Sequence, residues 1–314
     1  MIDPIRICDV SKSFGDRQAI NALSLNIKAG EITVLMGRSG SGKSTLLRMI
    51  NGLMRPTSGS VKIQGRPLHE LHAQELIALR RHSIAMVFQS FALFPHRTAL
   101  ENAAFGLEIG GMARRPRLER ARHILDRVGL AKDLHRYPEQ LSGGMRQRVG
   151  LARALALDPP ILLMDEAFSA LDPLIRTDMQ DLLLGLQQEQ PRTIVFVSHD
   201  LDEAVRVGDH IALLHNGQLL QVGTAPEFLL NPATETVRTF FSSIDPADVL
   251  HLGAIAEPAN ADSLDQLPRL PATTRLRDAM ATIAHAGAIA VMDQQDQLQG
   301  VVTAQSLLHA LQPQ

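Results

Sequence analysis

The sequence predicts an α/β fold with a largely parallel sheet, followed by a small α+β module. Short apolar runs typical of buried strands alternate with helical patterns over most of the chain. After Asp245 the composition changes to a stretch rich in proline, alanine, asparagine and aspartate, which is typical of a linker. We therefore predict a large domain at residues 1–245, a linker at 246–275 and a small module at 276–314.

Four continuous apolar runs predict the central strands of the large domain, because strands buried on both faces need no polar alternation. These runs are residues 31–36, 84–88, 161–165 and 193–198. The dipeptide Asn216–Gly217 between two apolar runs predicts a β-hairpin. Between residues 101 and 156 helical periodicity replaces the strand pattern, which predicts a helical subdomain at about 90–157.

The C-terminal module has the pattern of an α-β-β-α unit. A helical pattern begins at Leu276, two apolar runs follow, and a second helical pattern begins at Gln305. Asp293 and Gln294 begin the turn between the two expected strands.

Composition excludes several classes of protein. A hydrophobic fraction of 45% in 314 residues argues against disorder. The 31 basic and 33 acidic residues give a net charge of −2, so no overall field attracts nucleic acid or anionic lipid. The arginine-rich stretch from Arg114 also contains acids, and we interpret it as a solvated helix face. We predict no nucleic-acid partner.

The sequence shows no disulfide and no obvious metal-binding pattern. Cys8 is the only cysteine, which excludes an internal disulfide, and we expect it in a buried strand. The 12 histidines show no metal-binding spacing.

The first residues lack the features of a signal peptide, and no apolar run reaches the roughly 18 residues of a membrane helix. We therefore expect a cytosolic chain, unless a partner holds it at a membrane.

A phosphate-binding loop follows the first of the four central strands. The segment GRSGSGKS has the G-x-x-x-x-G-K-[ST] spacing and leads into a helical pattern that begins with Thr45. Its members are Gly37, Arg38, Ser39, Gly40, Ser41, Gly42, Lys43 and Ser44. Its backbone N–H groups can surround a phosphate chain, while Lys43 supplies a charge and Ser44 a hydroxyl for Mg²⁺. A plain flexible turn is the alternative, which the flanking strand and helix disfavour.

Two adjacent acids end the apolar run at residues 161–165. Neighbouring side chains in a strand point to opposite faces, so Asp165 and Glu166 are expected to have separate roles. Phosphoryl transfer needs a carboxylate for the metal and a group that orients the attacking water. We assign Asp165 to the metal and Glu166 to the water. Two helix-capping acids are the alternative, which the P-loop disfavours.

The order of these motifs resembles that of the ABC ATPases over residues 1–243. LSGGMRQR, which lies between the P-loop and Asp165, is similar to the family signature, and the chain also carries counterparts of four further motifs. The signature residues are Leu141, Ser142, Gly143, Gly144, Met145 and Gln147. The four counterparts are Phe14 for the adenine-stacking aromatic, Gln89 for the Q-loop glutamine, Asp172 for the D-loop acid and His199 for the switch histidine.

The resemblance implies that two copies of the chain pair head to tail. The signature, which opens a helix running from Ser142 to about Leu157, then completes the γ-phosphate site of the other copy. The implied cofactors are ATP and Mg²⁺. The implied catalytic residues are Lys43, Gln89, Glu166 and His199, and the implied metal ligands are Ser44, Gln89 and Asp165.

A narrower resemblance is to the ATPase subunits of bacterial importers for glycine betaine, proline betaine and choline. The motifs AMVFQSFALFPHRT and LLMDEAFSALDPLIRTDMQD carry it. The chain departs from this group in lacking an extra stretch between Phe14 and the P-loop strand. Its tail is also long enough for only one of the usual two CBS modules. We expect that module to support dimerisation, and a sensor of ionic strength or of a nucleotide is the alternative.

The importer resemblance implies a peripheral location on the cytoplasmic face of the bacterial inner membrane. The implied partners are a second copy of the chain, an integral membrane permease and, indirectly, a substrate-binding protein. Nothing in the chain touches the cargo, so import of an amino acid, polyamine or phosphonate stays open. A soluble ABC ATPase that does not transport is a further alternative.

Overall fold

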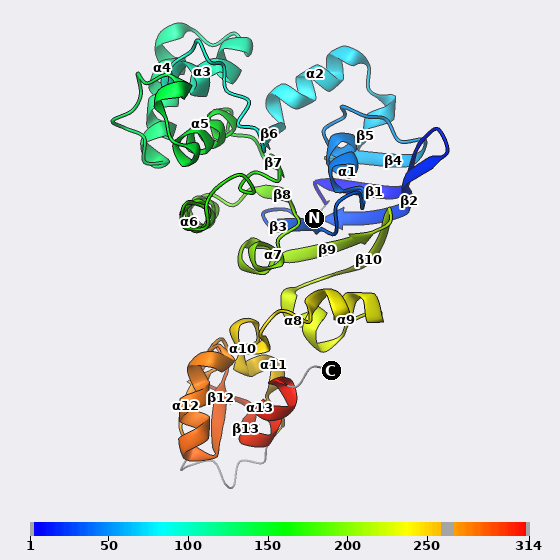
Figure 1. Ribbon diagram of the computed structural model, residues 1–314, viewed down its shortest axis with the longest axis vertical. Helices are drawn as coiled ribbons and strands as arrows, with labels where there is room; N and C mark the ends of the chain where they lie inside the picture. The colour runs from blue at the N-terminus through cyan, green and yellow to red at the C-terminus, as the bar shows by residue number, and fades with distance from the viewer. Residues whose placement is uncertain (1–2, 259–266, 312–314) are drawn as a thin grey trace. The chain divides into compact units, whose positions relative to one another are not determined.

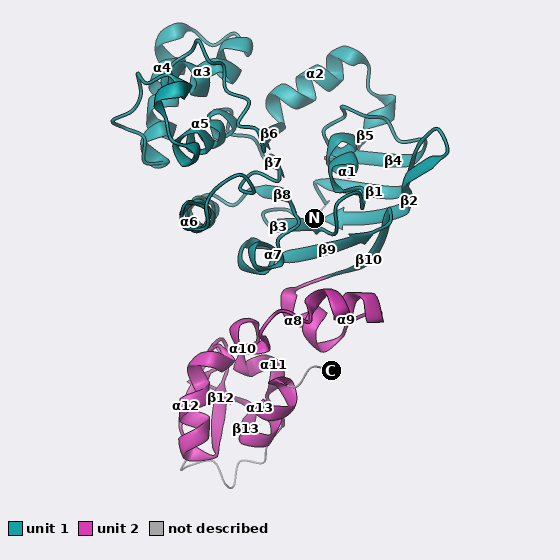
Figure 2. Ribbon diagram, in the orientation of Figure 1, with its two compact units in different colours: residues 1–222 teal, residues 223–314 magenta. Residues whose placement is uncertain are grey.

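The computed structural model of the protein describes residues 3–258 and 267–311 (Figure 1). The chain forms two compact units, Met1–Val222 and Gly223–Gln314 (Figure 2). This division comes before residue 245, the predicted end of the large domain. The reason is that helix α8 (Ala225–Leu230) contacts both α9 (Glu235–Phe241) and α10 (Pro246–Val249), which lies beyond that residue.

The first unit is built on a six-stranded sheet with the order β10-β9-β3-β8-β7-β6. The predicted central strands are confirmed as β3 (Ile32–Met36), β6 (Ile84–Phe88), β7 (Ile161–Asp165) and β8 (Thr193–Ser198). They pair in parallel from β3 to β8, from β8 to β7 and from β7 to β6. Their carboxyl ends therefore meet at one edge, which is where parallel sheets bind ligands.

The predicted hairpin is also confirmed. Strands β9 (His210–His215) and β10 (Gln218–Gly223) are joined by Asn216 and Gly217, whose φ angles are +48° and +77°. Positive φ at both central residues is the geometry of a type I′ turn, which matches the twist of the paired strands.

A second, antiparallel sheet with the order β2-β1-β4-β5 was not predicted. Its strands are β1 (Ile5–Phe14), β2 (Arg17–Ile27), β4 (Ser58–Ile63) and β5 (Arg66–Pro67). Cys8 lies in β1 as expected, but the prediction that it is buried was wrong, because its side chain is only half-buried. The alternation of the strand sends its neighbour Ile7 to the core instead.

Three helices form the predicted helical subdomain. They are α3 (Ala99–Ile109), α4 (Arg114–Arg127) and α5 (Gly143–Leu155), and Figure 1 shows them together in one lobe away from the antiparallel sheet. Thr98 begins α3 by accepting a hydrogen bond from the backbone of Glu101, whose carboxylate accepts one from Thr98 in return. The arginine-rich helix α4 carries the exposed pair Arg115–Glu119, as expected of a solvated face.

Four further helices lie outside this lobe in the first unit. They are α1 (Lys43–Ile50), α2 (Ala73–His82), α6 (Pro173–Glu189) and α7 (Leu201–Val207). A short 3-10 turn, η1 (Leu68–Glu70), precedes α2, and a second, η2 (Pro138–Gln140), precedes α5 in the lobe. Across residues 3–258 and 267–311, no helix is long and apolar enough to cross a membrane.

The second unit contains a three-stranded sheet with the order β11-β12-β13. Its C-terminal elements are α11 (Leu252–Ile255), β11 (Arg269–Pro271), α12 (Leu276–Ala286), β12 (Ala288–Met292), β13 (Leu298–Thr303) and α13 (Ala304–Leu311). The expected α-β-β-α order is present from α12 to α13. The turn after β12 is organised by Asp293, whose Oδ1 accepts hydrogen bonds from the backbone N–H groups of Gln295 and Gln297.

The segment predicted as a linker contains more structure than its composition indicates. Helices α10 and α11 and strand β11 lie within it, and residues 259–266 of the predicted linker lie outside the described part of the chain. Ala247, Leu250 and Leu252 are buried in one apolar cluster with Leu276 and Ile289. Burial of these apolar side chains stabilises the segment against the core of the module.

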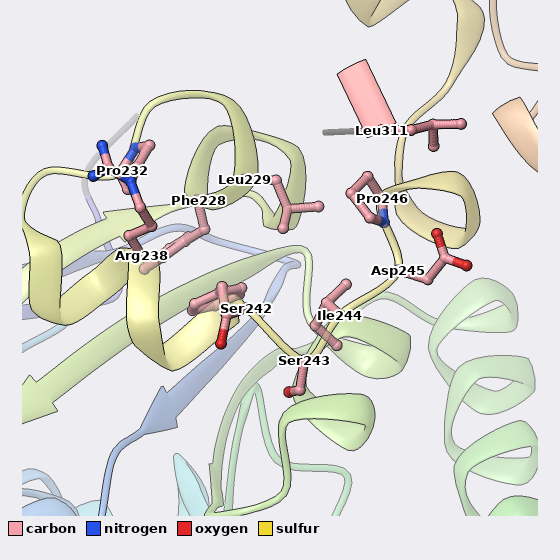
Figure 3. Close-up of a pocket in the computed structure, with 11 residues that line it drawn as sticks. Phe228, Leu229, Pro232, Arg238, Ser242, Ser243, Ile244, Asp245, Pro246 and Leu311 are labelled. Carbon is pink, nitrogen blue, oxygen red and sulfur yellow. The ribbon is translucent and has the colours of Figure 1, made fainter. Parts of the chain in front are cut away.

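A cavity of about 370 Å³ lies within the second unit (Figure 3). Phe228 lies at one side of the cavity, and Pro246 and Leu311 lie at the other. Phe241, a further lining residue, stacks on Phe228 with the ring centroids 4.5 Å apart. Helices α8 and α9 thus line the same cavity as residues of the C-terminal module. Removal of the module would expose apolar side chains of these two helices.

Candidate nucleotide site

The P-loop connects strand β3 to helix α1 and depends on two glycines. Gly37 has φ +146°, and a Cβ on it would lie 2.1 Å from the carbonyl oxygen of Leu214. Gly42 has φ +104°, and a Cβ on it would lie 2.4 Å from Ile20 Cδ1. Side chains at these two positions would displace the loop, so the sequence can form this turn only with glycine there.

Lys43 is held inside the loop. Its Nζ donates to the carbonyl oxygen of Gly37 at 2.6 Å and to that of Arg38 at 3.1 Å. Burial lowers the pKa of Lys43, and the carboxylates of Glu166 and Asp165 oppose that shift. A cation that is partly desolvated and bonded to neutral carbonyls is well prepared to exchange them for a phosphate oxygen.

Ser44 and Asp165, the two residues expected to hold the metal, are hydrogen-bonded to each other. The Ser44 hydroxyl donates to Asp165 Oδ1 at 3.0 Å, across two segments far apart in the sequence. Burial raises the pKa of the Asp165 carboxyl, and the hydrogen bond from Ser44 opposes that shift. Oxygen ligands of this kind suit Mg²⁺, which commonly takes one or two protein oxygens and completes its shell with phosphates and water.

Glu166 and His199 lie together at the ends of β7 and β8. His199 Nδ1 is 3.4 Å from Glu166 Oε2. Glu166 has φ +46°, and its N–H donates to the carbonyl oxygen of Val197 at 3.1 Å. The sequence analysis expected strand alternation to separate the two acids, but the strand ends at Asp165 and Glu166 adopts a left-handed turn directly after it. Both carboxylates remain close enough to Lys43 to oppose the lowering of its pKa.

Gln89 reaches this group through a serine that the sequence analysis missed. Gln89 Nε2 donates to Ser169 Oγ at 3.0 Å, and Ser169 Oγ donates to the carbonyl oxygen of Glu166 at 2.9 Å. Gln89 therefore lies beside the backbone of the assigned water-orienting residue. A serine between the two acids and Asp172 carries no distinctive sequence signal.

A cavity of about 340 Å³ lies at the P-loop and reaches Glu166. It is lined by Phe14, Arg17, Ala19, Ser39, Gly40, Gly42, Lys43, Ser44, Thr45 and Glu166. Phe14 is 49% exposed, and Lys12 Nζ lies 5.2 Å from the ring centroid. Arg17 and Ala19 are lining residues that the sequence analysis missed, because strand β2, which brings them to the P-loop, was not predicted.

The residues present fit a magnesium nucleotide. The lining of the cavity includes the ring of Phe14 and most of the P-loop. Within the P-loop, Ser41 Oγ is buried without a hydrogen-bond partner among the described residues. A buried hydroxyl without a partner is costly, and a phosphate or a water molecule would satisfy it.

The signature residues lie at the start of α5. Ser142 Oγ accepts from the backbone N–H of Met145 at 3.3 Å, so the helix begins where the sequence predicted. A Cβ on Gly144 would lie 2.4 Å from Ile175 Cγ2, so this glycine allows close packing on α6. Leu141 is buried, and Gln147 is 0% exposed, so Gln147 is enclosed in its own chain rather than presented to a partner.

The structure does not bring the signature to the P-loop of the same chain. Among the described residues that line the P-loop cavity, none belongs to residues 141–147. Asp172 likewise has a local contact, because its Oδ1 accepts from the N–H of Ile175 at 3.1 Å and caps α6. A signature that faces a second copy would account for this separation.

Comparisons with known proteins agree with this combination of fold and site. The family described as "ABC transporter" matches residues 20–169. The ATP-binding cassette MJ0796, in a dimeric post-hydrolysis state bound to ADP and Pi, superposes with a TM-score of 0.64 at 38% identity, covering 70% of this chain and 98% of that chain.

Two curated relatives are transport proteins for betaines. The glycine betaine/proline betaine transport system ATP-binding protein ProV of Salmonella typhimurium is 56% identical over 78% of this chain and 61% of its own length. The glycine betaine transport ATP-binding protein OpuAA of Bacillus subtilis is 47% identical over 94% of this chain and 69% of its own length. The chain thus spans about three fifths of the Salmonella protein.

The P-loop, the adjacent acids Asp165 and Glu166, His199 beside Glu166 and the separate signature are together typical of an ATP-binding cassette. The chain belongs to the family of ABC transporter ATP-binding proteins.

Proposed function

We propose that the chain is the ATP-binding and ATP-hydrolysing subunit of an ABC importer for a betaine-type osmoprotectant such as glycine betaine, proline betaine or choline. The observation that carries the proposal is the cluster at the carboxyl ends of β3, β7 and β8, where Lys43, Ser44, Asp165, Glu166 and His199 come together. The names of the two betaine relatives support the choice of cargo.

In this proposal each part of the cluster has one task. The P-loop holds the phosphate chain and Phe14 stacks on the base, while Ser44 and Asp165 would hold Mg²⁺, with Gln89 as a further ligand. Magnesium bound there would offset negative charge on the phosphates. Glu166 accepts a hydrogen bond from the attacking water and polarises it, and His199 donates to the γ-phosphate. Coupling of ATP hydrolysis to movement of the cargo requires the membrane permease and is therefore a property of the assembled transporter.

The partners follow from the same proposal. A second copy supplies Ser142, Gly143 and Gly144 to the γ-phosphate, an integral membrane permease carries the cargo, and a substrate-binding protein delivers it. The chain would then be a peripheral protein of the inner membrane on its cytoplasmic side. Residues 276–314, together with β11, form a single CBS-like module in this proposal, which rests on the order of the strands and helices of the tail.

Uptake by cells tests the cargo directly. A host strain that lacks this chain should lose the salt-induced uptake of labelled glycine betaine, and the wild-type chain should restore it. A Lys43→Ala chain, which lacks the phosphate-binding charge, is the matched negative control. Normal betaine uptake without the chain, or loss of amino-acid or polyamine uptake instead, would assign a different cargo.

Asp165→Asn is expected to separate folding from metal binding. Burial raises the pKa of Asp165, so the folded chain binds this proton more tightly than the unfolded chain does. Stability from this group is therefore present at low pH and is lost as the pH rises through the folded-state pKa. At about pH 7 the neutral amide should make the nucleotide-free variant at least as stable as wild type. The difference in unfolding free energy between the two should shrink toward about pH 4, where the wild-type carboxyl is protonated as well.

The same variant should lose the magnesium-dependent part of its stabilisation by ATP. Saturating ligand at about 100 times Kd contributes about 2.7 kcal/mol to wild type, which a thermal melt with and without Mg²⁺ can measure. A variant that melts lower without nucleotide, or that keeps the full magnesium effect, would contradict the role of Asp165.

A chain that ends at Asp245 is expected to retain ATPase activity and permease binding but to dimerise more weakly. The truncation removes the C-terminal module and the Pro246 and Leu311 side of the cavity in Figure 3, so Phe228 and Leu229 lose apolar neighbours. Analytical ultracentrifugation with ATP measures the dimer. Arg277→Ala is the matched control, since it breaks the ion pairs with Asp245 and Asp248 while keeping the module. Unchanged dimerisation with loss of the response of transport to salt or to a nucleotide would identify the tail as a sensor.

A further inference from the structure

The segment that carries His199 is fixed by a buried carboxyl group. Glu203 in α7 is 5% exposed, and Ser198 at the end of β8 is 2% exposed. Ser198 Oγ donates to Glu203 Oε2 at 2.5 Å and accepts from the N–H of Asp200 at 3.0 Å. Gln180 Nε2 donates to the other carboxylate oxygen of Glu203 at 3.2 Å. The hydroxyl of Ser198, directly before His199, is therefore bonded both to Glu203 and to Asp200, directly after His199.

Burial raises the pKa of Glu203, and the hydrogen bonds from Ser198 and Gln180 oppose that shift. A buried carboxyl is costly unless it is well bonded. Two hydrogen bonds to one buried group fix its orientation, and through Ser198 they fix the start of the turn that presents His199.

Arg176 in α6 connects this turn to the turn that carries Asp172. Its Nη1 donates to Asp200 Oδ2 at 2.9 Å, and its Nη2 donates to the carbonyl oxygen of Leu171 at 3.2 Å. Leu171 directly precedes Asp172, and Asp200 directly follows His199. One guanidinium group thus bridges the two segments, and its planar shape keeps both contacts in a defined geometry.

Asp200 is occupied on both sides. Its Oδ1 accepts from the N–H of Glu203 at 3.1 Å and caps α7, while its Oδ2 receives Arg176. A movement of the turn before Asp172 would therefore displace the Asp200 carboxylate, which is also hydrogen-bonded to the first turn of α7. The contacts form a short chain of bonded groups from one turn to the other.

We propose that Arg176 and Glu203 are positioning residues for ATP hydrolysis. Glu203 holds the peptide of His199 through Ser198, and Arg176 ties this peptide to the turn of Asp172. A movement of the turn that carries Asp172 is thereby transmitted to the histidine in the same chain. The inference rests on the proposed function, because only there do His199 and Asp172 take part in hydrolysis.

The matched test compares two ion pairs that join the same two helices. Arg176→Gln breaks the contact with Asp200, whereas Arg206→Gln breaks the exposed pair between Arg206 Nη2 and Asp181 Oδ1, 2.7 Å apart, which touches neither turn. In the full-length chain we expect Arg176→Gln to lower kcat by about 10- to 100-fold, with KM for ATP within about twofold of wild type. Arg206→Gln should keep kcat within about twofold of wild type.

A second pair of variants tests the buried anchor. Ser198→Ala removes the hydroxyl with little change in volume and should lower kcat without raising KM. Glu203→Gln keeps an oxygen that can accept from Ser198, provided that the amide of Gln180 turns over, and should retain most of the activity. Equal kinetics of Ser198→Ala and wild type would overturn the role of the anchor.

A double variant separates this inference from the proposed function. If Arg176 acts through His199, adding Arg176→Gln to His199→Ala should cause little further loss of kcat. A slow His199→Ala chain beside a normal Arg176→Gln chain would overturn this inference alone. Wild-type turnover by His199→Ala would overturn the assignment of the histidine in the proposed function, and this inference with it.

Discussion

Glu166→Gln is expected to keep ATP binding and to lower steady-state turnover by about 10²- to 10⁴-fold, the usual contribution of a general base. The amide has the shape of the carboxylate but lacks the charge that polarises water. Glu166 lines the P-loop cavity and lies 3.4 Å from His199 Nδ1, so it is placed to contact both the water and the histidine. The variant should therefore accumulate as a dimer with ATP bound at both sites.

Three measurements check this result. Phosphate release gives the turnover, equilibrium binding of a fluorescent ATP analogue gives the affinity, and size-exclusion chromatography with ATP shows the dimer. Glu189→Gln is a suitable control, since it removes an acid that pairs with Arg127. Phosphate release near the wild-type rate from Glu166→Gln would reject the assignment of Glu166 as the residue that orients water.

Much of this site could be predicted from the sequence because its parts are local. The P-loop needs glycine where a Cβ would clash, and an apolar strand followed by two acids is visible in a single stretch. The parts that were missed depend on distant residues. Ser169 matters because Gln89 folds against it, and Arg17 because β2 brings it to the P-loop. Neither contact leaves a periodic pattern in the sequence.

The secondary structure likewise was predicted where it depends on local sequence and was missed where it depends on contacts between distant residues. Strands β6, β7 and β8 are continuous apolar runs, and they were predicted with their observed bounds. The sheet of β1, β2 and β4 was missed because its strands alternate irregularly, with register shifts between β1 and each partner. In the tail, Ala247 and Leu250 look like part of a loose linker until Leu276 and Ile289 provide the core that buries them.

Ser142→Arg is the second variant with a large expected effect, and it tests where the signature acts. Ser142 is exposed at the start of α5, and the P-loop cavity of its own chain is lined by other residues. We expect ATP affinity of the isolated monomer within about twofold of wild type. Hydrolysis should fall by about 10²-fold or more, because the arginine would occupy the space for the γ-phosphate of the other copy.

Ser142→Ala is the matched control for the helix cap. Both substitutions remove the hydrogen bond from Met145, which costs about 1 kcal/mol of helix stability. The difference between the two variants in phosphate release therefore reports on the interface rather than on the folding of α5. A large loss of ATP binding by monomeric Ser142→Arg would show that the signature acts within its own chain.

Mixing two inactive variants gives the sharpest result. In a head-to-tail dimer of Ser142→Arg with Lys43→Ala, one site combines an intact P-loop from the first chain with an intact signature from the second. The other site carries both defects. Random pairing should then restore up to about a quarter of wild-type phosphate release, since half of the dimers are mixed and each has one intact site. If the signature served the nucleotide of its own chain, every chain in the mixture would be defective and mixing would restore nothing.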